Sequence, residues 1–284
     1  MESIASLKYS LNFNKSLDQI INILKIATSI QLRQFQQESW GEQRFQDEVL
    51  AGLPLFEKEE IIKNTLMFRE QDFPQGIVVV TSDEGFLGEL NMLILNAAMK
   101  AKKNDNDVFI VLGEKGAQFF RGINQSFMFF PGVKENTYMS TALKLKKFLF
   151  REYLKKTINK VVIIFAEFIS ITARHVQVKQ LLPFPQEEIS GKGKGNKQAG
   201  LMITPSRDEV IEGLIGLQMD SLITKMLYSS KMSELAARLM HLESSYQELT
   251  RINRNLSREY FKSVHALADK RIRELLASRI KVNK

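Results

Sequence analysis

Apolar side chains recur at three- and four-residue steps through about the last seventy residues of the chain, which contain no proline and no glycine after Gly216. These side chains are Leu235, Leu239, Leu242, Tyr246, Leu249, Ile252, Leu256, Tyr260, Val264 and Leu267. The spacing lines one stripe of a helix that would span roughly 100 Å at about 1.5 Å per residue. A single globular domain of this size cannot bury such a helix, so a partner helix must cover the stripe.

The beginning of the chain offers that partner helix. From Ile4 to about Trp40 there is no proline or glycine, and an apolar stripe at helical spacing is interrupted at Asn14 and Asp18. The stripe consists of Ile4, Leu7, Leu11, Leu17, Ile21, Leu24, Thr28 and Leu32. We predict an antiparallel coiled coil between an N-terminal helix within residues 1–60 and C-terminal helices within residues 206–284. The alternative is that each helix packs on the middle of the chain instead.

The middle of the chain alternates between short β-branched runs and helical segments. Strands are expected at 76–81, 107–112, 127–130, 160–166, near 175–182 and at 201–204. Helices are expected at 87–103, directly after 113–116, and at 141–156. This alternation predicts a mostly parallel sheet with helices on its faces, and therefore a Rossmann-like α/β domain over residues 75–205.

Two local signals concern the C-terminal helices. Ser206 and Glu209 have the spacing of a capping box, in which the serine and glutamate side chains satisfy free backbone N–H groups at a helix start. A break near Ser229–Lys231 would divide a short helix from the long one, although serine is a weak helix breaker.

The charge of the chain is concentrated in the distal part of the long helix. The formal net charge is +8, and the chain contains no cysteine. From Arg251 onward, ten basic residues stand against three acidic residues, which gives +7 for this part alone. Such a face can meet nucleic acid, an acidic protein surface or only water. The N-terminus lacks the pattern of a signal peptide, and no apolar run approaches the roughly 20 residues that span a bilayer, so a soluble or peripheral protein is expected.

The candidate site for chemistry is the turn after the first expected strand, residues 81–88, where a doubly wound sheet usually holds its ligand. This turn has neither a complete GxGxxG pattern nor glycines followed by Lys-Ser or Lys-Thr, and Asp83, Glu84 and Glu89 would repel phosphate. The glycine- and lysine-rich run at 190–200 reads as a flexible loop. The three histidines lie far apart in sequence without ligand spacing. The sequence thus predicts no catalytic residue, no cofactor and no metal.

Several stretches together resemble the gamma subunit of F-type ATP synthases. Ser233-Glu234-Leu235-Ala236-Ala237-Arg238-Leu239 is similar to that family's Ser-Glu-x-x-Ala-Arg-Met. The turn that contains Ser82, Asp83, Glu84, Gly85 and Gly88 is similar to its Ser/Thr-Asp-Arg-Gly-Leu-Cys-Gly-Gly-Leu-Asn. The segments beginning at Gly113 and Gln180 look like its Gly-x-Lys-Gly and Gln-Leu-Leu-Pro-Leu-Pro. The resemblance covers the full chain and implies two terminal helices coiled beside a small α/β domain.

The departures from the family pattern lie at the turn and at the distal contact segment. Glu84 stands where the family has arginine, and Glu89 where it has glycine. The glutamine, threonine and glutamate with which the family touches its catalytic subunits correspond to His265, Asp269 and Arg271. The resemblance implies partner-contact residues at these positions and in the family motif, and the basic face supplies further candidates. The set is Ser233, Glu234, Arg238, Arg251, Arg254, Arg258, His265, Asp269 and Arg271.

The function implied by the resemblance is that of a non-catalytic central rotor stalk, present in one copy per rotary ATPase complex. The implied partners are alpha and beta subunits, an epsilon subunit and the membrane c-ring, at the cytoplasmic face of a bacterial plasma membrane. The changes in the contact segment favour a divergent or alternative rotary ATPase. Two other functions remain open: a basic coiled-coil protein that binds nucleic acid, and a nucleotide-binding enzyme of the middle domain.

Overall fold

The computed structural model describes residues 3–38, 74–183 and 206–282. Two compact units are distinguished, one formed by Met1–Ile30 with Leu239–Lys284 and the other by Gln31–Arg238. We call them the helical unit and the α/β unit. The predicted domain limits of 1–60, 75–205 and 206–284 remain a prediction. The expected strand at 201–204 and the glycine- and lysine-rich loop at 190–200 lie outside the described residues.

The α/β unit is built on one five-stranded sheet with the order β3-β2-β1-β4-β5. The strands are β1 (Gln75–Val80), β2 (Val108–Leu112), β3 (Phe127–Phe130), β4 (Lys160–Phe168) and β5 (Arg174–Leu182). Neighbouring strands from β3 to β4 are parallel, and β5 joins β4 as an antiparallel hairpin. The mostly parallel sheet predicted from the sequence is thereby confirmed, because buried β-branched runs alternate with helices as in βαβ units.

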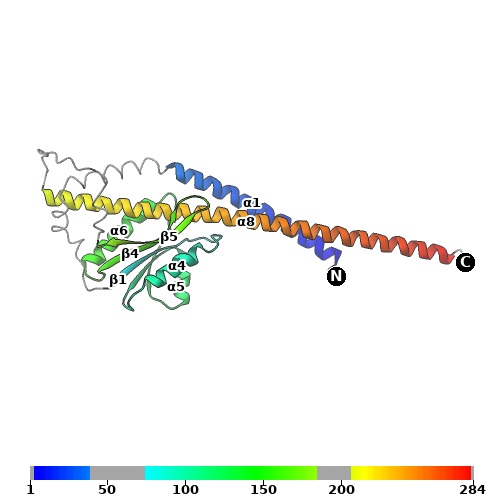
Figure 1. Cartoon of the computed structure of the whole chain (residues 1–284), viewed down its shortest axis with the longest axis horizontal. Helices are drawn as coiled ribbons and strands as arrows, with labels where there is room; N and C mark the ends of the chain where they lie inside the picture. Colours follow the sequence, from blue (N-terminus) through cyan, green and yellow to red (C-terminus); the bar gives the residue numbers. More distant parts are fainter. Residues whose placement is uncertain (1–2, 39–73, 184–205, 283–284) are drawn as a thin grey trace. The chain divides into compact units, whose positions relative to one another are not determined.

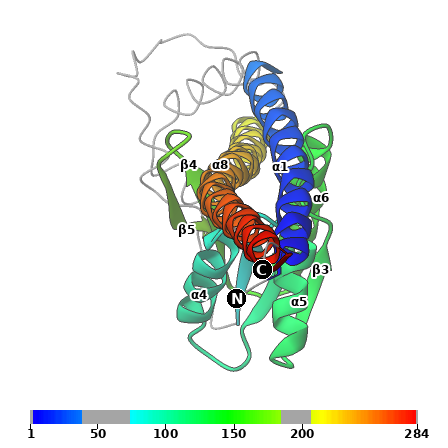
Figure 2. The same cartoon turned by 90° about the vertical axis from the view of Figure 1, so that its right-hand side faces the viewer.

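Helices cover both faces of this sheet (Figures 1 and 2). They are α4 (Leu90–Ala101), α5 (Glu114–Gly122) and α6 (Tyr138–Leu154). Because side chains alternate along a strand, Ile77 and Val79 point to the face where they share a buried cluster with Ile94 of α4 and Phe120 of α5. Phe35, from the end of α1 (Ile4–Glu38), is 2% exposed and packs edge-on against Tyr138 of α6.

Helix α8 (Arg207–Val282) is continuous over 76 residues. The predicted break near Ser229–Lys231 is wrong: the Ser229 hydroxyl accepts a hydrogen bond from the Phe168 backbone at 2.8 Å, and this tertiary contact outweighs the small helix penalty of serine. At the start of α8 the Ser206 hydroxyl accepts the Glu209 N–H at 3.3 Å. The serine half of the predicted capping box is therefore confirmed.

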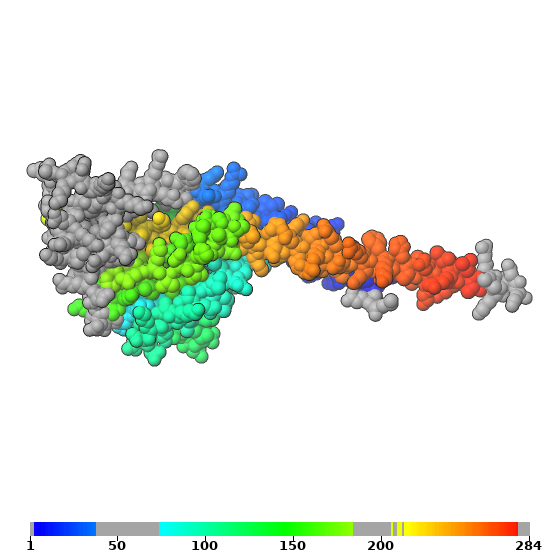
Figure 3. All heavy atoms as spheres, viewed as in Figure 1, coloured from blue at the N-terminus to red at the C-terminus, as the bar shows by residue number. Residues whose placement is uncertain are grey.

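In the helical unit α1 and α8 run antiparallel. Lys25 of α1 forms an ion pair of 3.1 Å with Glu243 of α8, whereas the earlier residue Leu11 lines a groove together with the later residue Ser257. The two helices therefore run in opposite directions, as predicted. Residues 265–277 of α8 are exposed, and Figure 3 shows this distal end, in red, without α1 beside it.

The stripes that make this contact differ in part from the predicted ones. On α1 a series of covered positions steps by three and four residues without interruption: 4, 7, 11, 14, 18, 21, 25, 28, 32 and 35; Ser10 beside it is also half-buried. Leu17 and Leu24, which were assigned to the stripe, are exposed, and Asn14, Asp18 and Lys25 take their places. On α8 the predicted positions Ile252 and Leu267 are likewise exposed, at 40% and 39%. The contact follows a seven-residue repeat whatever the polarity of the residue that falls on it.

Candidate functional site

The turn after β1 lies where the strand order of the sheet reverses. Strands β2 and β3 extend on one side of β1, and β4 and β5 on the other, so the switch point falls between β1 and β4. In doubly wound sheets ligands bind outside the carboxyl ends of the strands at such a point. The residues that occupy this position therefore decide whether the α/β unit can hold a nucleotide.

A carboxylate of the chain itself occupies the place that a phosphate would take. Asp83 Oδ1 accepts hydrogen bonds from the backbone N–H of Glu114, the first residue of α5, at 3.0 Å and from that of Gly132 at 3.2 Å. A helix N-terminus favours a negative charge because its first N–H groups lack partners within the helix. At Gly132 a Cβ atom would come within 2.5 Å of the Asp83 carboxylate, so the fit is close. Asp83 thus satisfies the anion site internally.

Neighbouring residues hold the turn in one conformation. The Thr81 hydroxyl donates to the Leu112 carbonyl at 2.7 Å and accepts the Gly116 N–H at 3.0 Å. The Ser82 hydroxyl donates to the Glu84 carbonyl at 2.7 Å and accepts a hydrogen bond from the Asn91 amide at 2.9 Å. These bonds connect the turn to β2, α5 and α4. The polar side chains of Thr81 and Ser82 consequently form hydrogen bonds within the fold.

Helix α8 crosses the carboxyl end of β4 at the same place. The Ser233 hydroxyl donates to the Ala166 carbonyl at 3.1 Å, and Ser233 is 0% exposed. Together with the bond between Phe168 and Ser229, this contact anchors one turn of α8 on the last residues of β4. The crevice that holds a ligand in related sheet topologies is covered by a helix in this chain.

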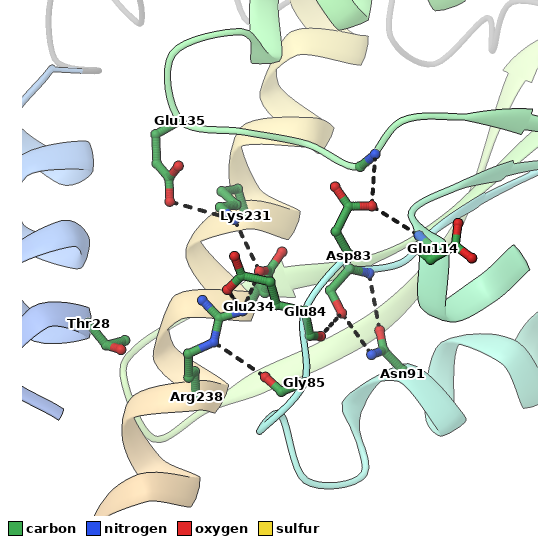
Figure 4. A network of polar contacts seen from close by, with 12 residues as sticks. Thr28, Asp83, Glu84, Gly85, Asn91, Glu114, Glu135, Lys231, Glu234 and Arg238 are labelled. Carbon is green, nitrogen blue, oxygen red and sulfur yellow. Dashed lines mark hydrogen bonds and ion pairs between the residues drawn. The ribbon is translucent and has the colours of Figure 1, made fainter. Parts of the chain in front are cut away.

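Charged residues of α8 join this helix to the turn (Figure 4). The Glu234 carboxylate accepts hydrogen bonds from Lys231 at 3.0 Å and from Arg238 at 2.9 Å. Arg238 also contacts Glu84 at 3.1 Å and donates to the Gly85 carbonyl at 3.4 Å. Burial raises the pKa of Glu234, and the charges of Lys231 and Arg238 oppose that shift. The network fixes the turn to the helix, and Glu84, where the resembling family has arginine, takes part as an acid.

The structure brings together two groups of residues that the sequence analysis named separately. Glu84 and Gly85 of the turn contact Arg238 of α8. Ser82 and Asp83 bond to other parts of the α/β unit, and Ser233 of α8 bonds to β4. Gly88 of the turn has a positive φ of 57°. Ser233, Glu234 and Arg238 are at most 8% exposed, and each of them forms a hydrogen bond within this chain. Sequence reasoning missed Lys231, Glu135 and Asn91 as members of this site. A signal was available for Lys231, which precedes Glu234 by one helical turn.

The remaining predicted contact residues are exposed on the distal part of α8. They are Arg251, Arg254, Arg258, His265, Asp269 and Arg271. Arg254 and Arg258 line a groove between the two helices together with Lys15 and Asp18 of α1. Arg251 forms an ion pair with Glu248 at 2.7 Å. A partner can reach these side chains, and their role as contacts remains a prediction.

We expect Asp83→Ala to lower the free energy of unfolding by about 1.5 kcal/mol, because two backbone N–H groups lose their acceptor and the N-terminus of α5 loses a favourable charge. Asp83→Asn keeps one acceptor oxygen and should lose roughly half as much. Urea unfolding followed by circular dichroism measures both changes. Equal stability of all three proteins would contradict the role assigned to Asp83.

Fold and site together define a protein whose α/β unit is closed to nucleotides at the usual position and continues into a long antiparallel helix pair. Among the described helices none is long and apolar enough to cross a bilayer. These features describe a stalk protein. The family model described as ATP synthase matches residues 3–274, so the chain belongs to that family, whose curated relatives are ATP synthase gamma chains.

The relatives match this chain over nearly its full length. The ATP synthase gamma chain of Chlorobaculum parvum is 26% identical over 98% of both chains, and that of Staphylococcus epidermidis is 23% identical over 97% of this chain and 98% of its own. Among solved structures, a chain of the Euglena gracilis mitochondrial ATP synthase rotor has a TM-score of 0.66 at 16% identity, covering 93% of this chain and 98% of that one. A chain of that enzyme's OSCP/F1/c-ring structure has a TM-score of 0.69 at 14% identity, with coverages of 98% and 94%. The predicted fold class, helix pair and Rossmann-like domain, is confirmed.

Proposed function

We propose that this chain is the central rotor stalk of a rotary ATP synthase or ATPase. One copy would turn inside a ring of alpha and beta subunits, with the epsilon subunit and the membrane c-ring bound at its other end. It would act as a peripheral protein at the cytoplasmic face of a bacterial plasma membrane. The chain itself would carry no catalytic site and would couple ring rotation to nucleotide turnover on its partners.

The observation that carries this proposal is the closure of the ligand position by Asp83 and α8, combined with a helix of 76 residues. A doubly wound unit without a nucleotide site is unsuited to be the enzyme. A long helix without proline or internal break is suited to transmit torque, because kinks arise at such breaks. The comparisons give no support to the alternative of a nucleic-acid-binding coiled coil.

The coupling follows from asymmetry. A shaft that presents different faces to three otherwise equal catalytic sites gives each of them a different nucleotide affinity at any moment. Rotation exchanges these affinities in sequence. The network of Lys231, Glu234 and Arg238 would hold the α/β unit to α8, so that a torque on one is passed to the other.

Affinity purification of the tagged chain from its native cell tests the proposal. Alpha- and beta-type ATPase subunits should be recovered with it at a fixed ratio of three each to one, and the purified chain alone should bind neither ATP nor ADP. Recovery of nucleic acid without such subunits, with binding that weakens steeply as salt rises, would instead support the alternative.

We predict that reversing Arg251, Arg254 and Arg258 to glutamate lowers coupled ATP turnover of the reconstituted complex by about tenfold, because charges at the rim of an interface steer and align acidic partner segments. The matched control replaces the same three residues by lysine, which keeps the charge and should keep most of the activity. If the glutamate variant assembles and turns over ATP as the unmodified complex does, the basic face has no role in coupling.

A further inference from the structure

The helical unit contains a polar groove between α1 and α8, with a volume of about 600 Å³. Lys15 of α1 lines it together with Arg254 and Arg258 of α8, and Asp18 is the acidic residue of its lining. Three cations and one carboxylate give the groove a formal charge of +2. Such a concentration of one sign of charge in a groove attracts anions from solution.

The helices that form the groove do not neutralise this charge. The ion pairs in the described part of the helical unit are those of Lys25 with Glu243, Arg251 with Glu248 and Lys270 with Glu274. None of them includes a residue that lines the groove. Arg254 and Arg258 are four positions apart on α8, a spacing at which like charges repel each other. An anion bound by Lys15 and these two arginines reduces that repulsion and contacts both helices.

The other polar residues of the groove indicate which anion fits it. The Asn12 amide and the Ser257 hydroxyl line the groove and are donors suited to anionic oxygens. Asn253 lines it as well, and its Oδ1 atom is buried without a hydrogen-bond partner among the described residues. A buried acceptor without a partner is unfavourable. An anion that also carries an O–H group supplies a donor for this oxygen, and the hydrogen phosphate dianion is such an anion.

We propose that the groove between α1 and α8 is a binding site for inorganic phosphate in its hydrogen phosphate form. Lys15, Arg254 and Arg258 bind the charged oxygens, directly or through bridging water, and the O–H group of the ion donates to Asn253. Bound phosphate links the two helices and stabilises the helical unit, because a ligand that binds only the folded chain shifts the folding equilibrium. The proposal does not depend on the stalk function.

Calorimetric titration of the full chain with phosphate and with sulfate tests the proposal, at constant ionic strength and about pH 8, where phosphate carries two negative charges. The two ions then have the same charge and similar size, but only phosphate has an O–H group. Phosphate should bind at one site per chain and about fivefold more tightly than sulfate. Asn253→Ala should bind the two ions equally, because its affinity for phosphate falls to that for sulfate.

Lys15→Gln removes one cation from the groove and should weaken the binding of both ions by about tenfold. The matched control is Lys8→Gln, which removes an exposed lysine of the same helix that does not line the groove. Its affinity for both ions should equal that of the unmodified chain. Circular dichroism of each variant shows whether the helix content is retained, so that a loss of affinity is not confused with unfolding.

Three results would overturn the proposal: equal affinity of the unmodified chain for phosphate and sulfate, an equal loss of affinity in Lys15→Gln and Lys8→Gln, or tighter binding of methyl phosphate than of phosphate. Methyl phosphate is an organic phosphate dianion without an O–H group, so it should bind about as weakly as sulfate. The titrations use the chain without partner subunits. Their failure would leave the stalk function intact, and a failure to recover alpha- and beta-type subunits would leave the phosphate site intact.

Discussion

Glu234→Ala is expected to lower the free energy of unfolding of the α/β unit by about 3 kcal/mol, because it leaves two buried cations without their shared carboxylate. Lys231 and Arg238 each lie within 3.0 Å of Glu234, and the side chains of all three are at most 10% exposed. Glu135 and Glu84 compensate little, since they are more exposed and solvent weakens their attraction. Chemical denaturation, monitored by hydrogen exchange of the β1 and β4 amides, measures this loss of unfolding free energy.

The Glu234→Gln variant separates charge from hydrogen bonding. Its amide oxygen still accepts from Lys231 and Arg238, and the raised pKa of Glu234 shows that burial disfavours the charged form, so the expected loss is about 1 kcal/mol or less. A raised pKa also means that the contribution of the native carboxyl declines as pH rises above the ordinary glutamate value of 4.5. As pH rises above 4.5, the stability of the unmodified chain should therefore fall relative to that of Glu234→Gln.

Two further variants identify the cause of the loss. Glu259→Ala removes an exposed carboxylate from the same helix and should change the stability by less than about 0.5 kcal/mol. Lys231→Met combined with Glu234→Met removes one cation together with the carboxylate and leaves Arg238 beside Glu84, so much of the stability should return. If this double variant is as unstable as Glu234→Ala, loss of side-chain packing, and not an unpaired charge, is responsible.

The sheet and the helices could be predicted because their signals are local. Runs such as 77–80 and 161–165 are apolar over their whole length, as is required of strands covered on both faces. The ends of these elements agree with the prediction to within about three residues, and glycine or proline marks several of them, as at 113 and 131–132. The antiparallel helix pair followed from the length of the stripe, which no domain of this size can bury.

The identity of the covered positions could not be read from hydrophobicity alone. Leu17 and Leu24 are more apolar than Asp18 and Lys25, yet the polar residues are the ones that face α8. The direction of a side chain is set by the repeat that the two helices share, and the opposing residues Glu243 and Tyr246 suit Lys25 through an ion pair and a ring contact at 4.5 Å. Partners of this kind, more than 200 positions away in sequence, leave no signal in a single helix.

The candidate site was half predictable for a similar reason. The acidity of the turn was visible in the sequence, and Asp83 of this turn binds backbone N–H groups of the chain itself. The sequence did not show that Asp83 itself takes the place of the anion, since the two N–H groups that it binds belong to residues 31 and 49 positions further along. It also did not show that Arg238 binds the turn, because the contact between Arg238 and Gly85 spans 153 positions. The role of Glu234 and Arg238 as partner contacts remains a prediction.

Gly113→Ala is expected to lower the free energy of unfolding by about 4 kcal/mol, the largest effect of any single substitution considered for this chain. Gly113 has a φ of 96°, and a Cβ atom at this position would lie 2.3 Å from the Thr81 carbonyl oxygen and 2.9 Å from the Ser82 carbonyl carbon. These atoms belong to the backbone of the turn and cannot rotate away. Relief requires β1 and β2 to separate where Thr81 N–H binds the Leu112 carbonyl at 2.8 Å.

Gly122→Ala is the matched control, because Gly122 ends the same helix α5 and a Cβ atom there would have no neighbour within 4 Å. It should leave the stability unchanged or raise it slightly, by reducing the freedom of the unfolded chain. Thermal unfolding of the three proteins at one pH gives the comparison. Since Gly113 also positions the amides that Asp83 binds, Gly113→Ala should abolish the additional effect of Asp83→Ala in the double variant. Full additivity of the two losses would show that the turn and the N-terminus of α5 are held independently.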